Sequence, residues 1–286
     1  MFHFVGRYVV RVSIKAAVLG LLAASAVSIS AQAQQTVQYV RYEQAGDASW
    51  GILDGGSIEQ LSDAPYLGGT PTGQSVQRSS VKLLAPVEPR QIFMTAFNFR
   101  SHITGDPAEY PGLFLVPPSS IVGPEDPITR PRESTNLHYE AEMVAVVGRE
   151  ANNVALEDAS DYIFGVSAGN DVSERTWQAG DIQWTRAKGS RGFNAVGPVL
   201  VTGLDYENLD IEGRLNGEVR QGENTADMIF GINYMLHYIS QHFTLYPGDL
   251  IWTGTMGATR PMEPGDVYEV ELDGVGVLSN EVAQGH

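Results

Sequence analysis

Only one stretch of this chain repeats its apolar residues at the spacing of an α-helix. From Thr225 to His242 they recur three or four positions apart, which predicts one long helix. The other apolar segments are short and bounded by Gly or Pro, and several alternate with polar residues, as strands do. Many strands and few helices, without regular alternation of the two, predict an α+β fold rather than a doubly wound sheet. The apolar residues of the predicted helix are Ile229, Ile232, Leu236, Ile239 and Phe243.

The first 33 residues have the pattern of a secretory signal. Arg7, Arg11 and Lys15 precede an apolar run over 16–30, and Ala31-Gln32-Ala33 follows as a cleavage site. The alternative is a membrane anchor, but about 15 apolar residues are short for a spanning helix, and no second such segment follows. We therefore expect an exported, periplasmic bacterial protein that has no membrane segment after signal cleavage.

Charge and composition exclude several classes of function. The 286 residues include 18 Lys and Arg against 34 Asp and Glu, so the formal charge is −16, and removal of the three positive residues in 1–33 makes it −19. So acidic a chain is poorly suited to bind nucleic acid or an anionic membrane surface. The absence of Cys excludes disulfides, thiolate nucleophiles and Cys-bound metals. Any metal ion must be held by oxygen or imidazole ligands.

The remaining chain is predicted to contain a small N-terminal β domain with a linker, residues 34–86, and a catalytic domain, residues 87–286. Short strands are expected between 36 and 61, and the Gly-, Pro-, Ser- and Thr-rich stretch 65–80 is predicted to be the linker. Seven of the 15 prolines lie in 107–131, which predicts an irregular loop that forms a lid or wall of an active site. Further strands are predicted at 91–97, 138–147, 164–172, 250–253 and 267–272.

Two glutamates in the predicted strand 138–147 are candidates for a metal site. Alternation along a strand places Glu140 and Glu142 on one face, about 7 Å apart at Cα, so both can lean onto one ion. The alternative is a solvated strand face, but the apolar stretch that continues the strand indicates burial, and buried carboxylates need a cation. Asp171, at the end of strand 164–172, could supply a third oxygen ligand or cap the turn that follows.

Lys188, His102 and Thr255 are further candidates. Beyond residue 33 the chain has 13 Arg and only two Lys, so Lys188 either supplies a required compact ammonium group or is a chance surface lysine. His102 follows a predicted strand and could act as a general base, although a lone His is more often structural. Thr255 ends a Thr-Gly-Thr turn that offers hydroxyl and backbone donors.

A series of short motifs runs through the chain from about Val81 to Val282. They are Asn98-Phe99-Arg100-Ser101-His102, Phe114 followed by Pro117-Pro118-Ser119-Ser120, Tyr139-Glu140-Ala141-Glu142, Asn170-Asp171-Val172-Ser173-Glu174-Arg175 with Gln178, Lys188, Gly197-Pro198, Asn216-Gly217-Glu218 with Gln221, Pro247-Gly248-Asp249 and Thr253-Gly254-Thr255. Each motif alone is weak, but their order and spacing together are specific. In this series the chain resembles the fumarylacetoacetate hydrolase family.

The resemblance implies a mixed β-sandwich-like roll that is usually a homodimer and holds a divalent cation, Mg²⁺ first, with Mn²⁺ or Ca²⁺ as alternatives. Glu140, Glu142 and Asp171 match the family's metal ligands. Lys188 matches its catalytic lysine and His102 its general base. The positions that match residues at or next to the substrate are Arg175, Gln178 and Thr255.

Five positions depart from the family's pattern, one of them Met256, which stands where many members have Pro. Gly105 stands where many members have a Glu, so His102 lacks its usual partner unless another acidic residue of the loop replaces it. Val116 replaces a frequent Lys, and His138 a frequent Asp. Arg191 reverses the charge of the usual acid three residues after the catalytic lysine, and we expect it to pair with a substrate carboxylate.

These observations predict a metal-dependent hydrolase that cleaves a carbon–carbon bond in a ketonic substrate, an acylpyruvate-like or 1,3-diketo acid. The cation would polarise the carbonyl, His102 would deprotonate water, and Lys188 would stabilise the oxyanion or enolate. One alternative is an isomerase, decarboxylase or hydratase of 2-oxo acids, which the missing partner of His102 favours. The other is a metabolite-binding protein that has lost catalysis.

Overall fold

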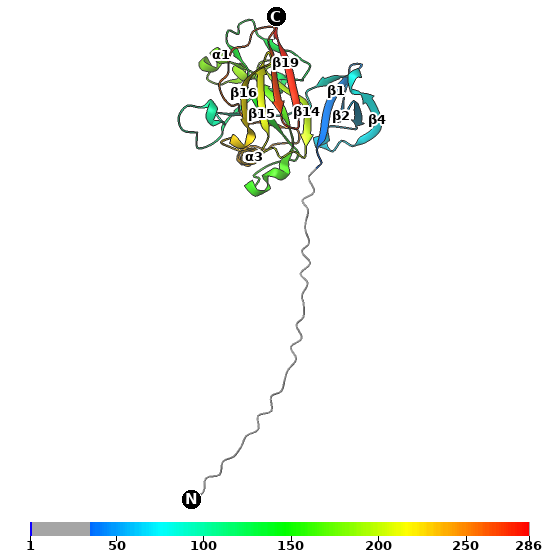
Figure 1. The fold of residues 1–286 in the computed structure, drawn as a ribbon, viewed down its shortest axis with the longest axis vertical. Helices are drawn as coiled ribbons and strands as arrows, with labels where there is room; N and C mark the ends of the chain where they lie inside the picture. Colours follow the sequence, from blue (N-terminus) through cyan, green and yellow to red (C-terminus); the bar gives the residue numbers. More distant parts are fainter. Residues whose placement is uncertain (2–34, 286) are drawn as a thin grey trace. The chain divides into compact units, whose positions relative to one another are not determined.

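The computed structural model describes residue 1 and residues 35–285. Two β-sheets that pack against each other make up most of the fold (Figure 1). In spatial order, the large sheet consists of β4 (Pro71–Gln77), β3 (Ser57–Leu61), β2 (Asp47–Asp54), β1 (Val37–Gln44), β14 (Asn194–Thr202), β12 (Ile163–Asp171), β11 (Ala141–Val147), β17 (Leu250–Trp252), β6 (Ile92–Ala96) and β7 (Gly112–Leu115), with β5 (Lys82–Leu84) on β1 and β8 (Ile121–Val122) on β14. The small sheet consists of β16 (Glu218–Asn224), β15 (Asp210–Leu215), β18 (Val267–Leu272), β19 (Gly276–Gln284) and β9 (Ile128–Arg130).

The remaining elements are short. A separate pair of strands joins β10 (Leu137–His138) to β13 (Ser173–Glu174), and the α-helices are α1 (Arg175–Gly180), α2 (Thr185–Gly189) and α3 (Ile232–Ser240). Single turns of 3₁₀ helix are η1 (Pro65–Leu67), η2 (Arg78–Ser80), η3 (Arg100–His102), η4 (Pro118–Ser120) and η6 (Thr225–Asp227), with a longer η5 (Leu156–Tyr162). The predicted α+β class is confirmed. None of the described helices is long and apolar enough to cross a membrane.

Strand β11 is buried on both faces, which explains its almost unbroken apolar sequence. Met143 and Ala145 belong to the core between the two sheets, whereas Val144 and Val146 pack with Trp252 in a second core on the opposite face of the large sheet. For Glu142 and the residues after it, this alternation agrees with the predicted strand, whereas Glu140 precedes β11. Glu142 therefore lies on the face of the second core, where the strand's end opens toward the candidate site.

The long helix predicted over 225–242 is shorter in the structure. Residues 225–227 form η6, and α3 begins only at Ile232. The backbone N–H of Ile229 donates to the carbonyl of Asn98 (2.8 Å), and that of Phe230 donates to the Asn98 side chain (2.8 Å). Because Asn98 holds these two amides, they do not bond the carbonyls of residues 225 and 226, and η6 does not continue into α3 as one helix. The apolar spacing was real, but a side chain distant in sequence decided where the helix starts.

Other predicted segments also differ from the structure. The predicted irregular loop 107–131 contains the short strands β7, β8 and β9, because a strand at the edge of a sheet tolerates nearby proline. Within the predicted linker 65–80, residues Pro71–Gln77 form β4, which pairs with β3 as an edge strand, because backbone pairing does not require apolar side chains. The predicted strand 138–147 is interrupted at Tyr139 and Glu140. There the Asn170 side chain accepts from the Glu140 N–H at 2.9 Å, which breaks the ladder and turns Glu140 toward the site.

The N-terminal strands continue the large sheet, since β1 pairs with β14 in an antiparallel register that places Tyr39 opposite Leu200. The division into domains at 34–86 and 87–286 stays a prediction. The predicted signal segment, 1–33, falls almost wholly outside the described residues.

Candidate metal centre and active site

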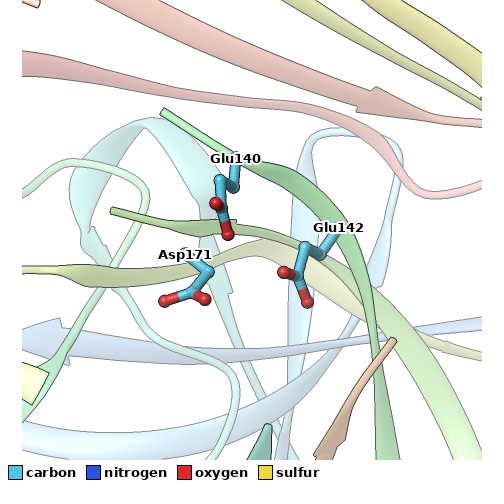
Figure 2. Close-up of side chains that lie close together, drawn as sticks. All are labelled: Glu140, Glu142 and Asp171. Carbon is cyan, nitrogen blue, oxygen red and sulfur yellow. The ribbon is translucent and has the colours of Figure 1, made fainter. Parts of the chain in front are cut away.

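Three buried carboxylates meet where two neighbouring strands of the large sheet end (Figure 2). β11 and β12 are antiparallel, with Glu142 opposite Gly169 and Ala141 opposite Asn170, so the start of one strand lies beside the end of the other. Glu140, Glu142 and Asp171 are only 4%, 2% and 1% exposed, and each offers an oxygen within 4.8 Å of the others. The structure thus brings these three side chains together, and their role as metal ligands stays a prediction.

The protonation of this cluster is unusual for carboxyl groups. Burial, followed by the charges of Asp171 and Glu140, raises the pKa of Glu142 well above its usual range. Burial also raises the pKa of Asp171 to about 7, although the ammonium of Lys188 opposes this shift. For Glu140, burial is outweighed by the charges of Lys188 and Arg175, and its pKa falls to about 2. Without another cation, the cluster therefore retains protons near neutral pH.

This donor set fits a divalent metal ion. All three side chains offer oxygen, the donor that Mg²⁺, Mn²⁺ and Ca²⁺ prefer. Because these carboxyl groups are hard to ionise together, a cation that replaces their protons would stabilise the ionised cluster. The Oε2 atom of Glu142 is held by the N–H of Gly254 at 2.8 Å. Gly254 has φ +82° and lies against Thr95, so a side chain there would strain this contact.

Lys188 is buried against the same carboxylates. Its Nζ donates to Oε2 of Glu140 and to Oδ2 of Asp171, both at 2.5 Å. Burial lowers the pKa of Lys188, but the carboxylates of Asp171 and Glu140 outweigh this and hold the pKa above its usual value. Lys188 is thus a charged ammonium group rather than a neutral base, and it is not a surface residue.

Arg175 extends the network on the other side of Glu140. Its Nη2 donates to Oε1 of Glu140 (2.5 Å) and to the hydroxyl of Thr259 (2.9 Å), while Nη1 donates to Gln178 (2.7 Å). The Thr259 hydroxyl also lies 2.8 Å from Nδ1 of His138. Burial and then the charge of Arg175 lower the pKa of His138 to about 4, so its ring is neutral at pH 7 and Nδ1 accepts a hydrogen bond from the Thr259 hydroxyl.

His102 has a backbone partner in place of the missing carboxylate. Its Nδ1 lies 2.6 Å from the carbonyl oxygen of Gly257. A carbonyl oxygen only accepts, so Nδ1 carries the proton and Nε2 is left as an acceptor. Asp106 and Glu109, the two acidic residues of this loop, are both exposed.

Several of the groups described above line a cavity of about 290 Å³. His102, Lys188, Glu140 and Thr255 all line it, together with an aromatic wall. The other lining residues are Arg175, Gln178, Ala179, Thr95, Ala96, Phe97, Phe114 and Trp184. Arg191 is exposed and does not line this cavity, and Val116 is buried beside Gly189.

Sequence reasoning missed several supporting residues. Asn194, at the start of β14, donates to Oδ1 of Asp171 at 3.0 Å, and no motif in the sequence pointed to it. Thr259 and Trp184 carried no signal, because both lie in irregular or very short segments and reach the site only through the fold. Gly257 was likewise unremarkable in the sequence.

A family comparison agrees with this geometry. The chain matches the model of the fumarylacetoacetate (FAA) hydrolase C-terminal family over residues 91–283. It belongs to the fumarylacetoacetate hydrolase family. The resemblance stated from the motifs is confirmed, and a second model, Rv2993c-like N-terminal, matches residues 38–86.

Relatives of this fumarylacetoacetate hydrolase family member are named for more than one reaction. Protein Rv2993c of Mycobacterium tuberculosis is 39% identical over 236 residues, 80% of this chain and 88% of that protein. The mitochondrial oxaloacetate tautomerase fahd2 of Xenopus laevis is 37% identical over 223 residues, 72% of this chain and 70% of that one. Family membership thus shows an enzyme-bearing fold without fixing its reaction.

Solved structures show the same breadth. The 2-hydroxyhepta-2,4-diene-1,7-dioate isomerase of Mycobacterium marinum is 34% identical with a TM-score of 0.81, and the match covers 87% of this chain and 98% of that one. Maleylpyruvate hydrolase of Sphingobium sp. SYK-6, solved with manganese(II) and pyruvate, is 26% identical with a TM-score of 0.73, covering 87% and 100%. The family fold therefore serves tautomerisation, isomerisation and hydrolysis.

The relatives contradict one prediction. Export to a bacterial periplasm was expected from the charged and apolar pattern near the N-terminus, but the relatives include a mitochondrial protein from Xenopus laevis. The pattern on which that prediction rested lies in residues that the structure does not describe.

Proposed function

We propose that this protein is a divalent-metal-dependent enzyme that moves a proton at the carbon next to the keto group of a 2-oxo acid, by tautomerisation or isomerisation. The observation that carries the proposal is that His102, with Nε2 as an acceptor, lines the same cavity as the charged Lys188 and Glu140, one of the three clustered carboxylates. The tautomerase and isomerase among the relatives support it.

A divalent cation held by Glu140, Glu142 and Asp171 would polarise the carbonyl of a 2-oxo acid bound through its adjacent oxygens. Nε2 of His102 accepts the proton as the C–H bond breaks, and the electron pair moves onto the keto oxygen. Lys188 has three N–H donors and uses two on Glu140 and Asp171, so the third is available to that oxygen. Proton return to oxygen or to another carbon completes the reaction.

Carbon–carbon bond hydrolysis of an acylpyruvate-like or 1,3-diketo acid is the second candidate. The same His102 could accept a proton from water, and the maleylpyruvate hydrolase among the structural relatives supports this reaction. A carbon between two carbonyl groups, as at C3 of oxaloacetate, releases a proton more readily than water does, so attack by water needs the stronger base. The carbonyl of Gly257 orients His102 but carries no full charge to stabilise an imidazolium, which favours the first candidate.

A homodimer, tested by sedimentation velocity, is part of the proposal and rests on the family resemblance.

Product analysis in D₂O separates the candidates, and in it pyruvate with CO₂ from oxaloacetate indicates decarboxylation, whereas two carboxylic acids from the 2,4-dioxo acid indicate hydrolysis. Protein stripped with chelator and reloaded with Mg²⁺ is incubated with oxaloacetate and, separately, with a 2,4-dioxo acid, and products are followed by NMR. Deuterium uptake at C3 without change of the carbon skeleton supports tautomerisation.

The metal requirement is tested with matched variants. Glu142→Gln removes a proposed ligand, and Glu150→Gln makes the same change at an exposed position after β11. We expect loss of turnover and of Mg²⁺-dependent thermal stabilisation in the first variant only. Full turnover by the chelator-stripped wild type, in the continued presence of chelator, would overturn the proposed function.

A further inference from the structure

A second cavity lies next to the catalytic cavity and has a different character. Its volume is about 510 Å³, and its walls come from β6, β7 and the segment before α2. Among the described residues that line it, none is charged, and aliphatic and aromatic side chains predominate. They include Phe93, Leu113, Leu115, Ile182 and Phe243.

The two cavities share one wall. Ala96, Phe97, Phe114 and Trp184 line both of them. The Trp184 ring contacts Phe97 and Phe114 edge-on, with centroid distances of 5.9 Å and 5.3 Å. Nζ of Lys188 in turn lies 5.7 Å from the centroid of the Phe114 ring. A molecule that extends away from Lys188 along these rings therefore enters the apolar cavity.

Phe97 has a backbone conformation that points to a role in this wall. Its φ is +60°, in the left-handed region that a bulky side chain rarely adopts, and the residue is 54% exposed. Strain of this kind is concentrated at binding and active sites, where the geometry is needed. Phe97 belongs to neither hydrophobic core, and it lines both cavities.

We propose that the apolar cavity binds the distal end of the substrate, which is an alkyl chain or an aryl group rather than a second carboxylate. This inference rests on the proposed function, because it assumes that the 2-oxo acid end binds at the carboxylate cluster. The 1,7-dioate named for the Mycobacterium marinum isomerase ends in a second carboxylate. Here the described residues that line the distal cavity offer that group no cation, and Arg191 lies outside it.

Unreactive analogues of 2-oxo acids test the proposal. In an N-substituted oxamate, the amide nitrogen takes the place of the reacting carbon next to the carbonyl. The carbonyl and carboxylate oxygens of the 2-oxo acid remain, but the molecule cannot lose a proton from that carbon or be cleaved there. Binding of oxamate, N-pentyl oxamate and N-(4-carboxybutyl) oxamate to the full Mg²⁺-loaded protein is measured by calorimetry. The last two ligands have chains of equal length and differ only in the terminal group. We expect the pentyl compound to bind at least about tenfold more tightly than the carboxybutyl compound.

A matched pair of variants tests the location. Leu115→Arg places a cation in the apolar cavity, and Val219→Arg makes the same kind of change on β16, outside both cavities. The two side chains are similarly exposed, at 50% and 54%, so both variants are expected to fold. Leu115→Arg should lower the preference for the pentyl compound by about fivefold or more, and Val219→Arg should leave it unchanged.

The outcomes separate this inference from the proposed function. Binding of oxamate with no preference between the two chains would overturn the apolar subsite and leave the proposed function standing. Binding of N-pentyl oxamate that does not depend on Mg²⁺ or on Glu142 would overturn the proposed function but support the apolar subsite. Equal binding of both chains, together with loss of a dimer in Leu115→Arg by sedimentation velocity, would make this wall an interface between two copies and overturn the inference.

Discussion

The Nδ1 atom of His102 lies 2.6 Å from the carbonyl oxygen of Gly257, 155 residues further along the chain. The contact is fixed from both sides, because the N–H of Gly257 donates to the hydroxyl of Ser101 at 2.8 Å. Two neighbouring residues on η3 thus hold one residue of the loop after β17. This arrangement orients the imidazole ring, a task for which the chain has no Glu at Gly105.

His102→Gln should therefore lower turnover without removing the metal site. General base catalysis contributes about 10²- to 10⁴-fold, so we expect a loss of kcat in this range while the Mg²⁺ affinity changes little. The matched control is His237→Gln on α3, because Nδ1 of His237 also bonds a backbone carbonyl, that of Val154, at 2.7 Å. Steady-state kinetics and Mg²⁺ titration compare the two. Unchanged kcat in His102→Gln would remove His102 from the proposed mechanism.

The two lysines beyond residue 33 should differ sharply in their effect on stability. Lys188→Met leaves Glu140 and Asp171 without their ammonium partner in a buried site, and breaking a buried pair in this way costs about 3–5 kcal/mol. Lys82→Met breaks an exposed pair with Asp126, for which about 0–1 kcal/mol is expected. Urea unfolding of the metal-free proteins gives both values. Turnover should be lost only in Lys188→Met, and equal stability of the two variants would contradict the structural account.

Metal binding should weaken as the pH falls. The pKa of Asp171 is raised from 3.8 to about 7, and that of Glu142 is raised well above its usual range. At a pH between the unfolded and the folded pKa of each group, the folded protein therefore binds more protons than the unfolded chain. In the absence of metal, the two groups therefore make the free energy of unfolding decline as the pH rises from about 4 to about 7. A divalent cation must displace these protons.

Calorimetry at several pH values tests this competition. We expect the Kd for Mg²⁺ to increase as the pH drops below about 7, and binding in buffers of different ionisation enthalpy to show proton release. The rise in Tm that Mg²⁺ produces should correspondingly be larger at pH 8 than at pH 6. A Kd that does not vary between these two pH values would show that the carboxylates are already ionised in the metal-free protein.

Thr259 should act on substrate binding through Arg175. The Thr259 hydroxyl accepts from Arg175 Nη2 and donates to neutral His138, so Thr259→Val removes one of the bonds that hold the guanidinium beside Glu140. We expect KM for the 2-oxo acid to rise by about fivefold to tenfold, in line with about 1 kcal/mol for one hydrogen bond, with little change in kcat. Thr259→Ser keeps the hydroxyl and should restore KM. A Ser variant as impaired as the Val variant would point to packing instead.

The carboxylate cluster could be predicted because its signals are local. Alternation along the predicted strand 138–147 put Glu140 and Glu142 on one face, an apolar continuation indicated burial, and the position of Asp171 at a strand's end suggested that it joined them. The strand itself begins only at Ala141, but the two side chains still meet. The rarity of lysine drew attention to Lys188. The partner of His102 and the start of α3 could not be predicted, because Gly257 and Asn98 act across more than 100 residues of sequence.

The sequence by itself determined the strand-rich class of the fold, the family and the chemical groups available for catalysis, since periodicity and motif order are properties of the linear chain. The tertiary structure decided which of those groups meet. The antiparallel register of β11 and β12 brings the carboxylates together, and the buried position of α2 makes Lys188 their partner. It also placed Arg191 outside the cavity and joined an apolar cavity to the catalytic one, because contacts between distant segments depend on packing rather than on spacing along the chain.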